Sequence, residues 1–316
     1  MTTTNHVTMP RILILLVFTG VTFRLALGAP AVPAGSGRIQ NGGISTSTEL
    51  DAGFQLLYEL KPAEARGQFD AWQKAHPRDP LGSAAVAASY LFEECNRQGI
   101  FTFEFFLNDK RLLGSIALKP DQALRAGFFA AEQQARDLAR LQLAVNPEDV
   151  NALFATMLDL GMRADYASMI EKHQLESLLM IREADEFAKK LLALAPDVSD
   201  AYFTLGAANY IIASLPEHKR FFFRLAGIRG AKDLGIQQMQ VAALHGRYLK
   251  PFAKMLLALM ALRDNKIEAA HTQLSELVAE FPRNPIFASE MAKLNVYSTA
   301  PNSRPWVVPS WRGPGY

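Results

Sequence analysis

Histidine and carboxylate side chains are the residues of this chain whose types suggest metal or acid–base chemistry. The sequence contains six histidines, but no two stand at the four-residue spacing that directs two imidazoles on a helix toward one zinc ion. The adjacent acids Glu93 and Glu94 would point in different directions on a helix, so we expect them to be a solvated helix end rather than an acid–base pair. The pattern therefore predicts no metal site.

Motifs for nucleophilic or phosphate chemistry are missing from the sequence as well. The chain has neither the Gly-x-Ser-x-Gly turn of serine hydrolases nor a glycine-rich phosphate loop that ends in Gly-Lys-Ser/Thr. The single cysteine, Cys95, has no partner for an internal disulfide, and we expect a buried thiol that behaves as a small hydrophobic side chain. We predict no catalytic residue and no cofactor, and we expect the protein not to be an enzyme.

The charge balance excludes a further class of function. The 33 Lys and Arg residues nearly cancel the 31 Asp and Glu residues, so no overall positive field directs the chain toward nucleic acid. Apolar residues make up 49% of the sequence, which is enough for a large core. Function is therefore expected to reside in local surfaces rather than in net charge.

One such surface is a cluster of basic and aromatic residues that consists of Lys219, Arg220, Phe221, Phe222 and Arg224. Rings next to cations suit a membrane interface or a partner, because the rings enter the lipid while the cations meet its phosphates. The alternative is that the aromatic residues pack on the rest of the protein and leave the cations in water.

A recurring proline phrase indicates how the chain positions these residues. It reads Ala-His-Pro-Arg-Asp-Pro at 75–80, Val-Asn-Pro-Glu-Asp at 145–149, Ala-Pro-Asp-Val-Ser-Asp at 195–200 and Phe-Pro-Arg-Asn-Pro at 281–285. Each phrase ends a helix, because proline lacks an N–H group and biases the residue before it out of the α region. Its repetition after amphipathic stretches predicts an all-α array of helix pairs.

The residues around these phrases resemble the tetratricopeptide repeat, in which two helices recur about every 34 residues with large and small side chains at fixed positions. The matching positions include Tyr202, Leu205, Gly206, Phe252, Leu256 and Leu259 in first helices and Ala65, Phe69, Ala184, Ala188, Ala270 and Leu274 in second helices. The resemblance implies a right-handed helical repeat solenoid, and it transfers no catalytic residue.

The segment 150–295 also resembles a group of exported bacterial tetratricopeptide-repeat proteins without an assigned activity. Phrases such as Leu205–Tyr210 and Gly246–Ala253 carry this likeness, and a remoter similarity links the segment to the Iml2-type repeat family. The resemblance implies a fold and a compartment outside the cytoplasm.

The prolines are irregularly spaced, which implies elongated helices and insertions in the solenoid. We expect one long helix that Pro120 opens, with Asp121 in its first turn, and that runs to Val145, and another from Leu175 to Leu194. Phenylalanine alternates with polar residues in the first part of 101–107, which suits a short strand or an extended aromatic plug.

The two ends of the chain differ from the predicted solenoid, which covers 47–297. Residues 1–31 contain an apolar run followed by small residues, as in a secretory signal peptide; an uncleaved N-terminal anchor is the alternative. Residues 32–46 are expected to be a flexible linker. The Pro/Trp-rich tail, 298–316, favours extended structure and either docks on a surface or is a disordered end. We expect an exported protein, periplasmic or membrane-associated.

Tetratricopeptide-like packing would place one row of first-helix side chains on a concave face. In this register nearly all of the row is apolar, and the expected contacts of a ligand are Phe154, Leu158, Met162, Phe203, Tyr210 and Met260. The whole row consists of Ala84, Ala88, Leu91, Phe92, Phe154, Leu158, Gly161, Met162, Phe203, Ala207, Tyr210, Ile211, Ala253, Leu257, Met260 and Ala261. A bare apolar groove of this length exceeds what monomers normally expose, so either the protein covers it or a hydrophobic partner does.

We therefore expect a non-catalytic extracytoplasmic scaffold or adaptor that binds a protein or peptide partner through the solenoid. The alternative is a carrier or sensor of an apolar small molecule or lipid in an enclosed groove. Contact with a membrane surface is a further expectation, and binding of nucleic acid is not expected.

Overall fold

The computed structural model describes residues 43–108, 111–112, 114, 116–214, 217, 220 and 229–299. All regular secondary structure in these residues is helical, and none of it is strand. The expected leader, the linker up to residue 42 and the tail from residue 300 onward lie outside the described residues.

The described residues form the following helices, in chain order. They are α1 (Thr48–Tyr58), α2 (Pro62–Ala75), α3 (Pro80–Arg97), α4 (Phe103–Leu107), α6 (Gln122–Val145), α7 (Val150–Asp165), the π-helix η1 (Tyr166–Glu171), α8 (Gln174–Leu194), α9 (Ala201–Ser214), α11 (Lys232–His245), α12 (Lys250–Arg263), α13 (Ile267–Glu280) and α14 (Pro285–Thr299).

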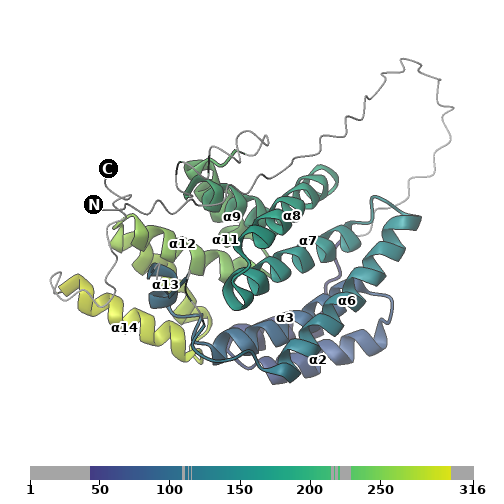
Figure 1. Cartoon of the computed structure of the whole chain (residues 1–316), viewed down its shortest axis with the longest axis horizontal. Helices are drawn as coiled ribbons and strands as arrows, with labels where there is room; N and C mark the ends of the chain where they lie inside the picture. The colour runs from purple at the N-terminus through teal and green to yellow at the C-terminus, as the bar shows by residue number, and fades with distance from the viewer. Residues whose placement is uncertain are drawn as a thin grey trace, which may run out of the picture. The chain divides into compact units, whose positions relative to one another are not determined.

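Neighbouring helices pack in sequence order, as Figure 1 shows for the series from α6 through α7 and α8. In addition, α1 contacts α3, α3 contacts α7 and α7 contacts α9, so the first helices of successive pairs form a layer of their own. The prediction of an all-α fold is confirmed, and the packing order is that of a helical repeat.

The proline phrases give four helices the same kind of end. The last residue of each helix is followed by His76 (φ −127°, ψ 67°), Asn146 (φ −132°, ψ 97°), Ala195 (φ −138°, ψ 81°) or Phe281 (φ −127°, ψ 65°), all outside the α region. Each of these residues precedes a proline, which disfavours the α conformation there. The phrases therefore stop the helices by local sterics, as the sequence predicts.

Three of the phrases also begin the next helix. Asp79 accepts a hydrogen bond from the N–H of Leu81, Asp149 accepts one from Ala152, and Asn284 accepts bonds from the N–H groups of the first turn of α14. Such N-caps stabilise a helix by about 1 kcal/mol, because they satisfy N–H groups that have no partner inside the helix. One short phrase thus ends one helix and begins another.

The turns within two helix pairs also share a geometry. Leu60 (φ 59°) after α1 and Asn265 (φ 57°) after α12 are left-handed. The next N–H groups, those of Lys61 and Lys266, each close a loop to a carbonyl five residues earlier, at 2.9 Å and 2.8 Å. This is the pattern of a Schellman end, and it makes α1–α2 and α12–α13 equivalent units.

The two long helices form close to where the sequence predicts them, although α6 begins at Gln122, two residues after the predicted start at Pro120. The carboxylate of Asp121 accepts hydrogen bonds from the N–H groups of Ala123 and Leu124, and α6 then runs to Val145. The second long helix, α8, starts at Gln174, one residue before the predicted start, and ends at Leu194.

The expectation of a strand in 101–107 is wrong, because Phe103–Leu107 form the helix α4. Phe101, Phe103, Phe105 and Leu107 are buried, whereas Thr102 and Phe106 are partly exposed and Glu104 is exposed, so the pattern marks the buried side chains although the backbone is helical. The guanidinium of Arg263 donates to the carbonyl of Phe106 at 2.5 Å, and the ammonium group of Lys172 lies 5.2 Å from the centre of the Phe105 ring. Contacts from distant helices therefore override the local pattern.

Helices α9 and α11 approach each other more closely than side chains normally allow. A Cβ atom added to Gly206 would lie 2.8 Å from the carbonyl oxygen of Gly235 and 2.9 Å from the backbone nitrogen of Met239. Gly235 meets the backbone of α9 in the same way. Glycine at both positions lets the two backbones touch, and this contact determines where α9 lies.

Candidate functional site

The six predicted groove residues fall into two groups. Phe154, Leu158 and Met162 of α7 and Met260 of α12 are buried, with 0–8% of their surface exposed. The two remaining residues, Phe203 and Tyr210 of α9, are partly exposed. Most of the predicted concave row is therefore buried in the core between the first helices.

Aromatic rings from distant helices meet in this interior. Phe92 of α3 lies 4.9 Å from Phe101 and 6.3 Å from Phe252 of α12, and Phe252 lies 5.4 Å from Phe203, measured between ring centroids. Phe154 of α7 lies 6.2 Å from the ring of Tyr248. The rings fill the space between the first helices, so the aromatic segment around α4 belongs to the core.

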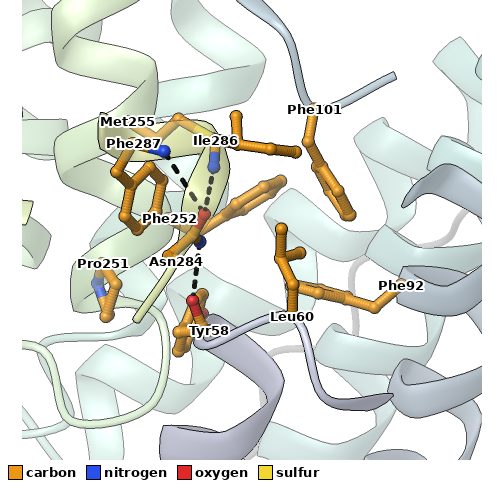
Figure 2. A pocket seen from close by; sticks show the side chains of 10 residues that line it. All are labelled: Tyr58, Leu60, Phe92, Phe101, Pro251, Phe252, Met255, Asn284, Ile286 and Phe287. Atoms are coloured by element: carbon orange, nitrogen blue, oxygen red, sulfur yellow. Dashed lines mark hydrogen bonds between the residues drawn. The ribbon is translucent and has the colours of Figure 1, made fainter. Parts of the chain in front are cut away.

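A pocket remains where the first helix pair meets the last helices (Figure 2). Its walls include Tyr58, Phe92, Phe101 and Phe252, and its volume is about 20 Å³. A single water molecule needs about 10–15 Å³ by the same measure. Asn284, the polar residue in the wall, donates to the carbonyl of Tyr58 at 2.8 Å and caps α14, as Figure 2 shows. We regard this pocket as a packing defect.

Tyr248, in the turn between α11 and α12, joins that turn to the first described residues of the chain. Its hydroxyl donates to the carbonyl of Ser45 at 2.7 Å, and its own carbonyl accepts from the hydroxyl of Tyr58 at 2.8 Å. Burial raises the pKa of both phenols. Arg247 forms an ion pair with Asp51 at 2.6 Å, so α1 is attached to the α11–α12 turn by side chains.

Asp200 holds that turn from the third proline phrase. Its carboxylate accepts three backbone hydrogen bonds, from Arg247 (2.8 Å), Tyr248 (2.9 Å) and Leu249 (2.6 Å). Burial raises the pKa of Asp200, and the three N–H groups oppose this effect. This role of Asp200 is not among the sequence predictions, although Asp200 ends a proline phrase and its three donors belong to the phrase Gly246–Ala253.

The exposed part of the predicted row is confined to one helix face, which we name the α9 strip (Phe203, Ala207, Tyr210 and Ile211). The first three are partly exposed, and Ile211 is 37% exposed. The inner edge of the strip packs on an apolar cluster of α11 and α12 that contains Met239. The α9 strip therefore offers one apolar edge to a ligand.

Cations lie at the far end of the α9 strip. The ammonium group of Lys232 lies 5.8 Å from the centre of the Tyr210 ring and forms an ion pair with Asp264 at 2.5 Å. Burial raises the pKa of Tyr210, and the charges of Lys232 and Arg263 lower it. The phenol stays protonated at neutral pH and can act as a hydrogen-bond donor.

Of the predicted basic and aromatic patch, only Arg220 is described. Its guanidinium donates to the carbonyl of Ala213 at 3.2 Å, at the C-terminal end of α9, where a cation is favourable. Lys219, Phe221, Phe222 and Arg224 lie outside the described residues.

Glu94 differs from its expected state. It was predicted to be solvated with Glu93, but it is 1% exposed. Its carboxylate accepts hydrogen bonds from Arg97 and Gln98, both at 2.8 Å. Glu94 is buried because the chain near Leu118 packs on the C-terminal end of α3. The side-chain amide of Gln98 donates to the carbonyl of Leu118 there.

Two further acids are buried between α6 and α7. Glu132 faces Arg163 at 3.3 Å, and Asp159 faces Arg136 at 3.7 Å. Burial raises the pKa of Asp159 to about 7, against the opposing charges of the two arginines. Acids and arginines are equal in number here, and the cluster joins the two helices by ion pairs.

The remaining candidates for chemistry are structural as well. Cys95 is 1% exposed, which confirms the prediction of a buried thiol, and burial raises its pKa. Within the described ranges, no group of three or more His, Cys, Asp or Glu residues is arranged to hold a metal ion. No helix in the same ranges is long and apolar enough to cross a bilayer.

Comparison with known proteins adds no relative. No family model, no curated protein and no solved structure matches this chain.

Proposed function

We propose that this protein is a non-catalytic adaptor that binds an apolar segment of a protein partner on the α9 strip. One observation carries the proposal: the predicted concave residues of α3, α7 and α12 are buried except Phe92 and Gly161, whereas three of the four on α9 are partly exposed and the fourth, Ile211, is 37% exposed. An apolar helix face that is left open between packed helices suits an amphipathic helix or an extended apolar segment of a partner.

The composition of the α9 strip fits this role. Phe203 and Tyr210 are large and partly rigid, and such rings often carry much of the binding energy of a protein interface. The hydroxyl of Tyr210 supplies a donor, and Arg263 and Lys232 supply positive charge at one end. We therefore propose a partner segment that is apolar along its length and carries a hydrogen-bond acceptor at one end.

The alternative is a carrier or sensor of an apolar small molecule or lipid. A pocket for such a ligand usually has a volume of about 300 Å³ or more. The pocket between the first and last helices holds about 20 Å³, so a carrier that encloses its ligand among the first helices would have to open the aromatic core there. The adaptor requires no such opening, and we prefer it for that reason.

Three finer features belong to the same proposal. We propose that the helix pairs form a right-handed tetratricopeptide-like solenoid, which the shared turn geometry of α1–α2 and α12–α13 supports. We propose export from the cytoplasm, supported by the apolar run and small residues of 1–31. We also propose contact with a membrane surface through Lys219, Phe221, Phe222 and Arg224.

Photo-crosslinking in the producing cell tests the adaptor. A benzophenone amino acid replaces Ile211 in one variant and Leu244, which is 67% exposed on α11, in a matched control. We expect a discrete protein adduct from position 211 that position 244 does not give, and we expect Ala207→Asp to abolish it.

Two results would contradict the adaptor. Identical adducts from positions 211 and 244 would show that the α9 strip has no partner. Adducts of lipid mass alone at position 211 would favour the carrier.

A further inference from the structure

The C-terminal end of α14 lies near the far end of the α9 strip. The hydroxyl of Tyr297, in the last turn of α14, donates at 3.4 Å to the side-chain oxygen of Asn265, in the turn between α12 and α13. The neighbouring Asp264 forms the ion pair with Lys232, whose ammonium group faces the ring of Tyr210. Helices α14 and α9 therefore end on the same edge of the array, and the chain continues beyond α14 from this edge.

The segment that follows α14 suits an apolar helix face. Residues 300–316 lie beyond the described part of the chain, and they contain Trp306 and Trp311 among four prolines. Proline-rich segments favour the extended polyproline II conformation and dock on surfaces that are lined by aromatic residues. The α9 strip is such a surface, because Phe203 and Tyr210 are partly exposed on it.

The segment is long enough to reach the α9 strip. Helix α12 contacts both α9 and α14, because Phe252 meets Phe203 at 5.4 Å and lines the small pocket together with Phe287. Packed helices lie about 8–10 Å apart, so the path from α14 across α12 to α9 measures about 16–20 Å. Trp306 follows the end of α14 by seven residues, which cover about 22 Å as polyproline II. Trp306 can therefore reach the Tyr210 end of the α9 strip.

The spacing of the two tryptophans also suits the α9 strip. Trp306 and Trp311 are five residues apart, which is about 16 Å in the polyproline II conformation. Phe203 and Ile211 are eight residues apart on α9, which is about 12 Å along the helix. The side chains can make up the difference of about 4 Å between these lengths. Both indole rings can therefore contact the strip at the same time.

Apolar contact rather than charge would hold the segment in this position. Arg304 and Arg312 are the charged side chains of the segment. The edge that the segment crosses carries Arg263 next to the ion pair of Lys232 with Asp264, so it does not attract these arginines. Salt should therefore not weaken the docking, because screening removes only a repulsion.

We propose that residues 300–316 fold back on the α9 strip and compete there with the partner segment. In this arrangement Trp306 meets Tyr210, and Trp311 lies toward Phe203. The competition rests on the proposed adaptor function, whereas the docking does not. A segment attached to its own site acts at an effective concentration of about 1 mM, so a contact with an intrinsic Kd of about 0.1 mM lowers the apparent affinity for a partner about tenfold.

Photo-crosslinking of the purified full chain tests the docking. Benzophenone at position 211 should form an adduct within the chain to a peptide that contains Trp306 or Trp311, and benzophenone at position 244 should not. The adduct should migrate as a monomer, and its yield should not depend on protein concentration. The double variant Trp306→Ala/Trp311→Ala should abolish this adduct, whereas Trp72→Phe, which alters the third tryptophan of the chain, should not. No adduct within the chain, or one that maps to residues 215–228, would overturn the docking and would not by itself refute the adaptor.

The same double variant tests the competition in the producing cell. Trp306→Ala/Trp311→Ala should increase the partner adduct from position 211 by about tenfold, because the competing segment no longer occupies the strip. A partner adduct of unchanged yield would refute the competition and leave the adaptor intact. Docking of the segment in the purified chain, with no partner adduct from either variant in the cell, would instead refute the adaptor.

Discussion

Replacing Gly206 by alanine should loosen the helix that carries the α9 strip. The new Cβ would lie 2.8 Å from the carbonyl oxygen of Gly235 and 2.9 Å from the nitrogen of Met239. Both atoms belong to the backbone of α11, so no side-chain rotation relieves the contact. The two helices must instead separate by several tenths of an ångström.

The magnitude follows from two opposing effects. Adding a methyl group to a well-packed interface costs about 1–3 kcal/mol. Alanine in place of glycine inside a helix returns up to about 1 kcal/mol through its higher helix propensity. The net loss in the free energy of unfolding should be about 1–2 kcal/mol, which corresponds to a fall in Tm of about 2–8 °C for a domain of this size.

Gly161 of α7 is the matched control, because a Cβ atom added there meets no atom within 4 Å. Gly161→Ala should gain the higher helix propensity of alanine without a steric clash of the new Cβ atom, and it should raise the Tm by about 1–4 °C. Thermal melts followed by far-UV circular dichroism measure both variants. A Gly206→Ala variant that melts at or above the wild-type temperature would refute the close approach of α9 and α11.

Three further predictions concern stability. Burial raises the folded-state pKa of Asp159 to about 7, so ionisation of this carboxyl between about pH 4 and pH 7 destabilises the wild-type fold. Asp159→Asn should therefore gain stability relative to wild type over this pH range, and urea titrations at pH 5 and pH 8 measure the difference. Asp200→Ala should lower the free energy of unfolding by about 2–5 kcal/mol, since three backbone N–H groups lose their acceptor. Asp200→Asn should lower the free energy of unfolding by less, and chemical denaturation compares the two variants. Leu205→Arg should abolish cooperative unfolding, because it places a charge at a position that is 7% exposed. Such a burial costs several kcal/mol, against a typical free energy of unfolding of about 5–15 kcal/mol. A soluble variant with a wild-type melt would show that the repeat register is wrong.

The sequence by itself determined the helices and where they end. Proline after His76 and Asn146 stops α2 and α6, and the carboxylates of Asp79 and Asp149 begin α3 and α7, through contacts that span two or three residues. The start of α6 after Asp121 was predictable for the same reason. Such interactions are local, so the amino-acid pattern contains all the information that they require.

Tertiary structure alone decided which apolar residues became core. The row on α7 and the row on α9 look alike in sequence, yet Phe154 is buried and Ile211 is 37% exposed. The difference arises from partners that are far away in the chain, such as Tyr248 against Phe154. The same holds for the backbone of α4, because the alternating pattern favours a strand but the segment is a helix that contacts Arg263 and Lys172. Burial depends on every element packed against a residue, and no local pattern specifies those elements.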